Sequence, residues 1–598
     1  MAVALASPPA WSQGGAPLPL KPEAEPPAPE APAPEVQPMV QPEIRIRGLG
    51  EVDPEAIGLL EAGQGGFGAG MWAQTPRNVV ELLLPRLPAG FGGRAAGALM
   101  RRLLLSSTPP PAGEERAASL VALRVERLLA MGDFAAAADL LGASPGRSTD
   151  PDLMHSAVTL HLFAYDFAAA CNLVRNVDQG AGAGFWQRAL IFCQAQMGEQ
   201  TQALFGLDLL REGGEVDETF VALVEALAGG GGAEAAPGTA TAFTLALLRA
   251  AERPVPAVYV VDAGPAILRA IANSDNADIG LRLEAAQRAE AAGGLSAEEL
   301  VAIYDLVELS PQEQAEPSQA AKADGGLRGE LILHRAARER VVPTARAELL
   351  RQMLNQAQAR GAHATAARLA APLLADIPPS SEFAWFAGDA ARALLAAGRA
   401  DLALSWYRLA QISASTDGNA AVAEAVLWPL LRLALGDGGA VAEVEEGRPP
   451  AGPQVVAVRP LAPVSPLAWD GGRLTAWRST RDVFAPEAAG DQIMLLYSLF
   501  EALGEPLSES DWQVLVGAAA SEPAARPPAA ELWFGLERAA AEGRIGETVL
   551  RALIMLGEDG LGRADPIVLA AAIRGLVKVG LAEEARSLAV EAAFAAGL

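Results

Sequence analysis

Apolar residues recur at three- and four-residue intervals along most of the chain, which is the spacing of one face of an α-helix. The run LVALRVERLLAM at residues 120–131 is one example, and AVLWPLLRLAL at residues 425–435 is another. Hydrophobic residues make up 51% of the sequence but aromatic residues only 5%, and alanine and leucine dominate. This composition favours helices, because strands prefer β-branched and aromatic side chains. The pattern therefore predicts an all-α fold.

Three segments of similar sequence follow one another at intervals of 33 residues, beginning at Gly132, Tyr165 and Gly198. They read GDFAAAADLL, YDFAAACNLV and GEQTQALFGL. In each, an alanine stands five residues after the first position and a large apolar residue stands nine after it; these residues are Ala137, Ala170, Ala203, Leu141, Val174 and Leu207. A helix-length amphipathic stretch precedes each segment, so the repeating unit contains two helices.

The repeated segment is typical of a helical hairpin. A glycine or another turn-forming residue ends the first helix. The small alanine allows the second helix to pack closely against the first, and the large residue completes the contact. A single hairpin cannot bury its apolar face, so successive hairpins must stack on one another. Stacking also accommodates 598 residues, because single cores rarely grow beyond roughly 250–300 residues.

This pattern resembles the tetratricopeptide repeat of bacterial proteins, in a divergent form. Shorter matches recur later in the chain, at Gly361 with Ala366, Gly398 with Ala403 and Tyr407, and Gly580 with Ala585. The tryptophan, leucine and glycine of that family's first helix are missing, and Gly361 and Gly398 are 37 residues apart. The resemblance implies an α-α superhelix, or solenoid, of helical repeats over residues 115–440 and 491–598. It also implies a groove that binds protein segments.

The rest of the chain divides into three predicted segments. We interpret residues 1–43 as a truncated signal peptide, with Ala4-Leu5-Ala6 as its cleavage motif, followed by a disordered proline-rich linker. A disordered N-terminus without a signal is the alternative, because a basic start is missing. Residues 44–114 carry a strand in IRIRGLG, a helix starting at Pro54, a glycine-rich loop and two further helices. Residues 441–490 are predicted to be an irregular linker, with short strands in VVAVRP and RLTAW.

Local signals mark several helix ends and loops. Ser296 and Glu299 show the capping-box pattern, and Asp150 followed by Pro151 predicts the start of another helix. The stretches at residues 229–238 and 310–326 are rich in turn-forming residues, and we predict that both are loops.

The chain is strongly acidic, with a formal net charge of −26 and a pI near 4.7. Nucleic acid and anionic membrane surfaces would be repelled, whereas a basic or apolar protein partner remains compatible. No run of 18 apolar residues occurs, so the sequence predicts no membrane insertion. Arginine greatly outnumbers lysine, which together with the many alanines and glycines indicates a GC-rich bacterial genome. The oligomeric state is not predictable from these features.

Two short motifs match catalytic or cofactor patterns without the context that these patterns need. Ser144 stands in a G-x-S-x-G match, but a nucleophile elbow follows a strand, and here a helix is predicted before it. Residues 63–68 match G-x-G-x-x-G, also without a preceding strand or a later acidic partner. We expect loops at both places. A variant of the second prediction exposes Phe67 and Trp72 for partner binding.

The remaining chemical candidates are few. Four histidines, His155, His161, His334 and His363, are expected to be structural, and we predict no metal or cofactor site. Cys171 and Cys193 fall on adjacent predicted helices. We expect two buried thiols that act as small apolar side chains, with a disulfide as the alternative in an exported protein.

Glu509-Ser510 is the one match to soluble lytic transglycosylases, which join a helical solenoid to a lysozyme-like domain. The other motifs of that family are missing, so we assign no catalytic residue. The sequence predicts a non-catalytic protein-binding scaffold or assembly factor of the bacterial cell envelope, located in the periplasm. A cytoplasmic adaptor or regulator is the first alternative, and a cell-wall-acting enzyme with a helical superstructure is the second.

Overall fold

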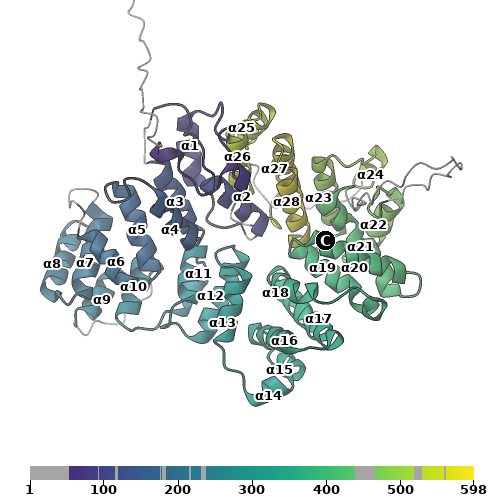
Figure 1. Cartoon of the computed structure of the whole chain (residues 1–598), viewed down its shortest axis with the longest axis horizontal. Coiled ribbons are helices and arrows are strands. Elements are labelled where there is room, and N and C mark those ends of the chain that lie inside the picture. Colours follow the sequence, from purple (N-terminus) through teal and green to yellow (C-terminus); the bar gives the residue numbers. More distant parts are fainter. Residues whose placement is uncertain are drawn as a thin grey trace, which may run out of the picture. The chain divides into compact units, whose positions relative to one another are not determined.

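The computed structural model describes residues 53–598, except 92, 115–118, 176, 178–182, 215–216, 230–237, 438–464, 517–527 and 558–559. The predicted leader, IRIRGLG and VVAVRP therefore lie outside the described residues. Residues 52–598 form one compact unit, and residues 1–51 are a separate unit. The described residues form helices and no strand, so the all-α prediction is confirmed (Figure 1). Leu60 and Ser106 form an isolated β-bridge.

The first half of the described chain contains short helices and then successive hairpins. The α-helices are α1 (Arg77–Leu83), α2 (Arg94–Leu105), α3 (Leu120–Ala130), α4 (Phe134–Ala143), α5 (Pro151–Phe163), α6 (Phe167–Val174), α7 (Ala183–Gln196), α8 (Gln200–Glu212), α9 (Glu218–Leu227), α10 (Ala242–Ala250), α11 (Pro265–Ala272), α12 (Ile279–Ala291), α13 (Ala297–Asp305) and α14 (Pro311–Ala315). Four 3-10 helices accompany them: η1 (Pro54–Ala56), η2 (Ala62–Gln64), η3 (Leu84–Arg86) and η4 (Ala257–Val260).

The second half continues in the same manner. Its α-helices are α15 (Pro317–Asp324), α16 (Leu327–Glu339), α17 (Pro343–Ala359), α18 (His363–Ala375), α19 (Ala387–Ala396), α20 (Ala400–Ser413), α21 (Gly418–Leu435), α22 (Gly471–Phe484), α23 (Ala489–Leu503), α24 (Glu509–Gln513), α25 (Ala530–Ala541), α26 (Ile545–Leu556), α27 (Pro566–Lys578) and α28 (Ala582–Ala595). One more 3-10 helix, η5 (Ser381–Phe386), precedes α19.

The three 33-residue segments are helical hairpins, as predicted. Helices α3 and α4, α5 and α6, and α7 and α8 pair through turns whose central residues have a left-handed backbone; these are Gly132, Tyr165 and Gly198, with φ of 78°, 57° and 80°. The three alanines at the contact are buried, at 0%, 1% and 0% exposure; they are Ala137, Ala170 and Ala203. Small side chains at these positions allow the two helices of each hairpin to approach closely.

Aspartate after the turn stabilises two of these hairpins. The carboxylate of Asp133 accepts the N–H of Ala136 at 3.1 Å, and that of Asp166 accepts the N–H of Ala169 at 3.1 Å. Each bond satisfies one N–H that the first helical turn leaves without a partner. The later turn glycines Gly361, Gly398 and Gly580 also have positive φ, and they join α17 to α18, α19 to α20 and α27 to α28.

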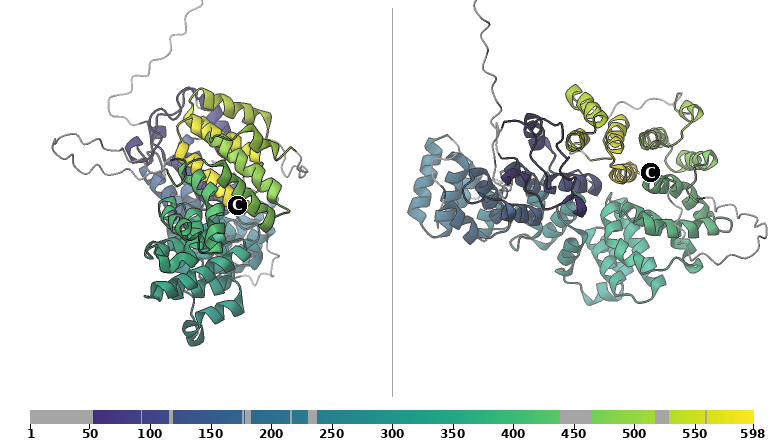
Figure 2. Two further views of the ribbon diagram at one scale, coloured as in Figure 1. Left: turned by 90° about the vertical axis from the view of Figure 1, so that its right-hand side faces the viewer. Right: turned by 45° about the horizontal axis from the view of Figure 1, so that its top comes forward.

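The beginning of the described chain packs against its end. Helix α2 contacts α26 and α28, and Figures 1 and 2 show these helices side by side. The backbone N–H of Gly546 donates to the carbonyl oxygen of Met71 at 3.0 Å, and Arg102 forms an ion pair with Glu584. These contacts join residues more than 450 positions apart, so the first helices of the described chain are packed directly against the last ones.

Several sequence predictions need correction. RLTAW is helical within α22 rather than a strand, because Asp470 caps the helix and Leu474 and Trp477, three residues apart, are both buried. Residues 310–326 contain α14 and α15 rather than a loop, since Ser310 forms a capping box with Glu313. The helix expected from Pro54 is only a 3-10 turn. Residues beyond it extend beside α2, where the N–H groups of Leu59 and Leu60 both bond to the Leu105 carbonyl.

The glycine-rich loop at residues 63–68 does not present its aromatic neighbours to solvent. Trp72 is buried, and its ring lies so close to Gly546 that a Cβ there would be 2.5 Å away. Phe67 is half-buried beneath the Arg102 guanidinium, 4.2 Å from the ring centroid. The prediction that both aromatic rings are exposed for a partner is therefore wrong, because each covers part of the packed N-terminal segment.

The preference for two free thiols is also wrong. Cys171 on α6 and Cys193 on α7 form a disulfide, with Cα atoms 5.5 Å apart. The hairpin repeat explains the pairing: the second helix of one unit packs on the first helix of the next, and this contact brings the two cysteines within bridging distance.

Helix α21 is apolar and long enough to cross a membrane by length and composition, and it is the one described helix with this property. It contains AVLWPLLRLAL and packs against α19, α20, α22 and α28. Arg432 on this helix is buried and donates to Glu505 at 2.7 Å. A charged side chain that is buried and paired against neighbouring helices is typical of a core helix, so α21 is interpreted as part of the packed core.

Candidate ligand cavity

A buried carboxylate joins three distant parts of the chain. Glu290, on α12, has 0% exposure. Its oxygens accept hydrogen bonds from Arg368 Nε at 2.6 Å, from Thr365 Oγ1 at 2.6 Å and from an Arg94 guanidinium nitrogen at 2.8 Å. Arg368 and Thr365 lie on α18, and Arg94 begins α2. Burial alone would raise the pKa of Glu290, but the hydrogen bond and charge of Arg368, together with Arg94, lower it below its usual range.

A second carboxylate connects α28 to the same place. The two oxygens of Glu591 accept the backbone N–H groups of Arg94 and Ala95, at 2.9 and 2.8 Å. These N–H groups belong to the first turn of α2, which has no partner for them within the helix. Gly93 precedes the helix and supplies no capping side chain, so a residue 497 positions away caps it instead. Burial raises the pKa of Glu591, and the two N–H bonds partly oppose this effect.

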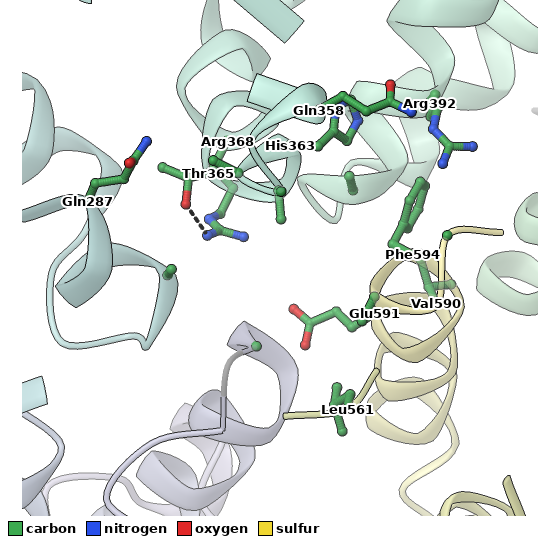
Figure 3. A pocket seen from close by; sticks show the side chains of 18 of the residues that line it. Gln287, Gln358, His363, Thr365, Arg368, Arg392, Leu561, Val590, Glu591 and Phe594 are labelled. Atoms are coloured by element: carbon green, nitrogen blue, oxygen red, sulfur yellow. Dashed lines mark hydrogen bonds between the residues drawn. The ribbon is translucent and has the colours of Figure 1, made fainter. Parts of the chain in front are cut away.

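A cavity of about 660 Å³ opens beside these groups (Figure 3). Its wall is formed by α12, the C-terminal end of α17, α18, α19 and α28, together with Gly93 and Leu561. Phe594, Val590 and Leu561 are the largest apolar side chains that line it. This volume is typical of sites for small organic molecules.

Polar side chains gather on one side of the cavity. In Figure 3, His363, Gln358 and Arg392 lie together, and Phe594 extends from α28 toward Arg392. The Arg392 guanidinium carbon is 5.1 Å from the Phe594 ring centroid. Glu591 points from α28 toward Arg368, which together with Glu591 also lines a neighbouring cavity of about 540 Å³.

Two of these polar groups have unmet hydrogen-bonding capacity. Both ring nitrogens of His363 and the Nε of Arg392 are buried without a partner among the described residues. Burial lowers the pKa of His363 to about 4, with the charge of Arg392 adding to the effect and the Leu354 backbone opposing it. Burial likewise lowers the pKa of Arg392 to about 10, so it remains a cation at neutral pH. Buried polar groups of this kind are usually bonded, so a ligand or water is expected to contact them.

The motifs singled out in the sequence lie away from this cavity. Ser144 ends α4, is buried, and donates its hydroxyl to the Leu140 carbonyl at 2.6 Å. Glu509 is exposed at the start of α24, inside a capping box formed by Ser508 and Asp511. Neither residue lines the two cavities described above.

The histidines are not gathered at one site. His155 lies against the Phe185 ring and His334 against Tyr304, with ring centroids 3.9 and 6.1 Å apart. Over the part of the chain that the structure describes, no group of three or more His, Cys, Asp or Glu side chains could hold a metal ion.

The sequence did not indicate the cavity, because its residues come from segments separated by hundreds of positions. His363 follows a repeat turn, and Phe594 belongs to the last helix, but nothing in their spacing relates them. Comparisons with protein-family models, with curated proteins and with solved structures found no match to this chain. The site is therefore interpreted from its own geometry and charge.

Proposed function

We propose that the protein is a non-catalytic, protein-binding scaffold or assembly factor of the bacterial cell envelope. The observation that carries the proposal is an exposed apolar surface on α8. Helices of stacked arrays at an open end usually turn a polar face outward. Helix α8, which packs on α7 and α9, instead exposes Leu204, Phe205 and Leu209.

The α8 apolar face, defined here as Leu204, Phe205 and Leu209, suits a partner of particular chemistry. Phe205 is 65% exposed and Leu209 is 50% exposed. Asp208 and Glu212 lie exposed on the same helix, where Arg211 pairs with Asp208 at 3.2 Å and with Glu225 at 2.8 Å and leaves Glu212 without this partner. An apolar strip bordered by carboxylates matches an amphipathic segment that carries basic residues, which also agrees with the net charge of −26.

The compartment is proposed from a neighbouring feature. The Cys171–Cys193 disulfide joins the two helices that precede α8. Disulfides persist in oxidising compartments, of which the bacterial periplasm is one, and are rare in the cytosol. This supports export and a periplasmic location, with the cytoplasmic adaptor as the alternative.

The binding proposal is tested by photo-crosslinking in the native host, with a photoreactive residue at Phe205 and, as a control, at Ile412. Ile412 is 78% exposed and lies on α20. The crosslinked partner is identified and purified, and its affinity is measured. We expect Leu209→Asp to weaken binding at least about tenfold, because burying a carboxylate against an apolar segment costs more than about 1.4 kcal/mol. Ile412→Asp should leave affinity unchanged.

Equal affinity of the Leu209→Asp variant and the wild type for the partner would overturn the assignment of α8 as the binding surface.

Cell fractionation with N-terminal sequencing and thiol alkylation tests the compartment in the same strain. A shortened, oxidised protein in the periplasm supports export. A full-length, reduced protein in the cytoplasm favours the adaptor. Hydrolysis of purified cell wall that is lost in Glu509→Gln would instead establish the enzyme alternative.

A further inference from the structure

The cavity beside Glu591 contains a cation that no carboxylate neutralises directly. Arg392 makes no ion pair with any residue that the structure describes. The carboxyl of Asp389 acts on it only through its charge, and the nearby Arg481 guanidinium opposes its protonation. A desolvated guanidinium without a counter-ion is unfavourable, and an anion placed against it would relieve that cost.

A comparison with Arg368, in the wall of the same cavity, shows what is unusual about Arg392. Arg368 is also partly buried, but two of its nitrogens donate to Glu290 at 2.6 and 2.7 Å. Arg288, the third arginine of the wall, donates to backbone carbonyls of residues 260 and 261. Arg392 is thus the arginine of this wall whose donors are left for a molecule in the cavity.

His363 provides a second group at the same side. Both of its ring nitrogens are buried without a partner in hydrogen-bond geometry among the described residues, the Leu354 backbone being the nearest protein group that acts on the ring, and it lies with Gln358 next to Arg392 (Figure 3). A neutral imidazole has one N–H donor, and the Gln358 amide supplies further donors. Together with the Arg392 guanidinium these groups match the several acceptor oxygens of a carboxylate or phosphate.

The opposite wall is mostly apolar but carries one carboxylate. Phe594 stands against Arg392, and Val590 and Leu561 also line the cavity, whereas both oxygens of Glu591 are already bonded to the N–H groups of Arg94 and Ala95. An inorganic anion would leave this wall in contact with water, whereas an organic anion with an apolar body would cover it. The volume of about 660 Å³ holds a molecule considerably larger than a simple ion.

We propose that this cavity, between α12, α18, α19 and α28, is a binding site for a small organic anion. The carboxylate or phosphate of the ligand contacts Arg392 and His363, and its apolar part lies against Phe594 and Leu561. The site is independent of the α8 apolar face. Because its walls come from the first, middle and last parts of the described chain, a bound ligand would also strengthen the contacts that tie the array together.

The test uses calorimetric titration of the full chain with four probes: phenylphosphate, phenylacetate, inorganic phosphate and benzylamine. We expect at least one of the two aromatic anions to bind and benzylamine not to bind. If phenylphosphate binds, inorganic phosphate should bind at least about tenfold more weakly. The tighter of the two aromatic anions identifies the anionic group. No measurable binding of either aromatic anion would overturn the proposal, since the cavity would then hold water only.

Variants connect binding to the named residues. Arg392→Gln should weaken binding about tenfold or more, the loss expected for one charge-assisted hydrogen bond. Phe594→Leu, which keeps an apolar side chain at this position, should weaken the binding of aromatic anions more than the binding of inorganic phosphate. Arg399→Gln is the matched control, because Arg399 lies exposed after the same helix and pairs with Asp401 at 3.0 Å. Unchanged affinity in both the Arg392 and the Phe594 variant would place the ligand elsewhere and overturn the proposal.

Discussion

The carboxylate of Glu591 caps the helix that begins at Arg94, accepting the Arg94 N–H at 2.9 Å across 497 positions of sequence. In an open array of hairpins each unit contacts only its neighbours, and its ends remain apart. Here the last helix instead completes the first turn of α2, and Arg94 itself extends to Glu290 in the middle of the chain. The three regions are therefore expected to unfold together rather than one hairpin at a time.

Replacement of Glu591 tests this cap. Glu591→Ala leaves two buried N–H groups without an acceptor and should lower the free energy of unfolding by about 1–2 kcal/mol. Glu591→Gln keeps one acceptor oxygen and should cost less. The urea midpoint measures both, and Glu537→Ala, at an exposed position of α25, serves as the control. A Glu591→Ala variant as stable as the control would show that water replaces the cap.

Glu290 should be more sensitive than any exposed carboxylate. Glu290→Gln leaves the Arg368 and Arg94 guanidinium groups facing a neutral amide in a buried place, so we expect a loss of about 3–5 kcal/mol. The double variant Glu290→Gln with Arg368→Gln should recover part of that loss, because both partners of the ion pair are then neutral. Strict additivity of the two single changes would show that the residues are not coupled.

Glu290 also contributes to acid sensitivity. Its pKa in the folded chain lies below the unfolded value. Its contribution to stability is therefore present above the unfolded pKa and is lost as the pH falls through the folded pKa.

His334 should contribute a separate pH dependence between about 6.5 and 4. Burial lowers its pKa to about 4; the charges of Arg338 and Arg335 act in the same direction, and Asp305 and the Leu369 carbonyl oppose them. The unfolded chain therefore binds a proton that the folded chain does not, and stability falls as the pH decreases through this range. The shift corresponds to about 3–4 kcal/mol at most. His334→Gln should flatten this part of a pH series of urea midpoints, and an unchanged slope would contradict the assignment.

Ala137 tests the packing of the repeat. It is fully buried between α3 and α4, so Ala137→Leu adds volume that a close-packed hairpin cannot accommodate and should cost about 1–3 kcal/mol. The neighbouring Ala138 is exposed, and Ala138→Leu should change the melting temperature little. Equal melting temperatures for the two variants would mean that the hairpin tolerates a larger side chain at this contact.

Much of the local structure could be predicted from the sequence, and the reason is that its signals are short-range. The 33-residue repeat located the turns at Gly132, Tyr165 and Gly198, and the buried alanine five residues after each turn. The Ser296–Glu299 capping box is present, with both reciprocal hydrogen bonds. Errors arose where one local signal outweighed another: RLTAW resembles a strand by composition, but the Asp470 cap and the burial of Leu474 and Trp477 make it helical.

The candidate site was beyond the reach of the same reasoning. Periodicity shows that Arg94, Glu290, Arg368 and Glu591 belong to helices, but a charged residue on a helix is normally solvated. Nothing in their spacing shows that they meet.

The sequence by itself determined the class of fold, because helical spacing, turn residues and small alanines act over a few positions and need no distant partner. The tertiary structure alone decided three other features. The disulfide between Cys171 and Cys193 depends on how successive hairpins pack. The cap of α2 by Glu591 depends on the return of the last helix to the first. The cavity at Arg392 depends on five helices whose separation along the chain carries no information about their distance in space.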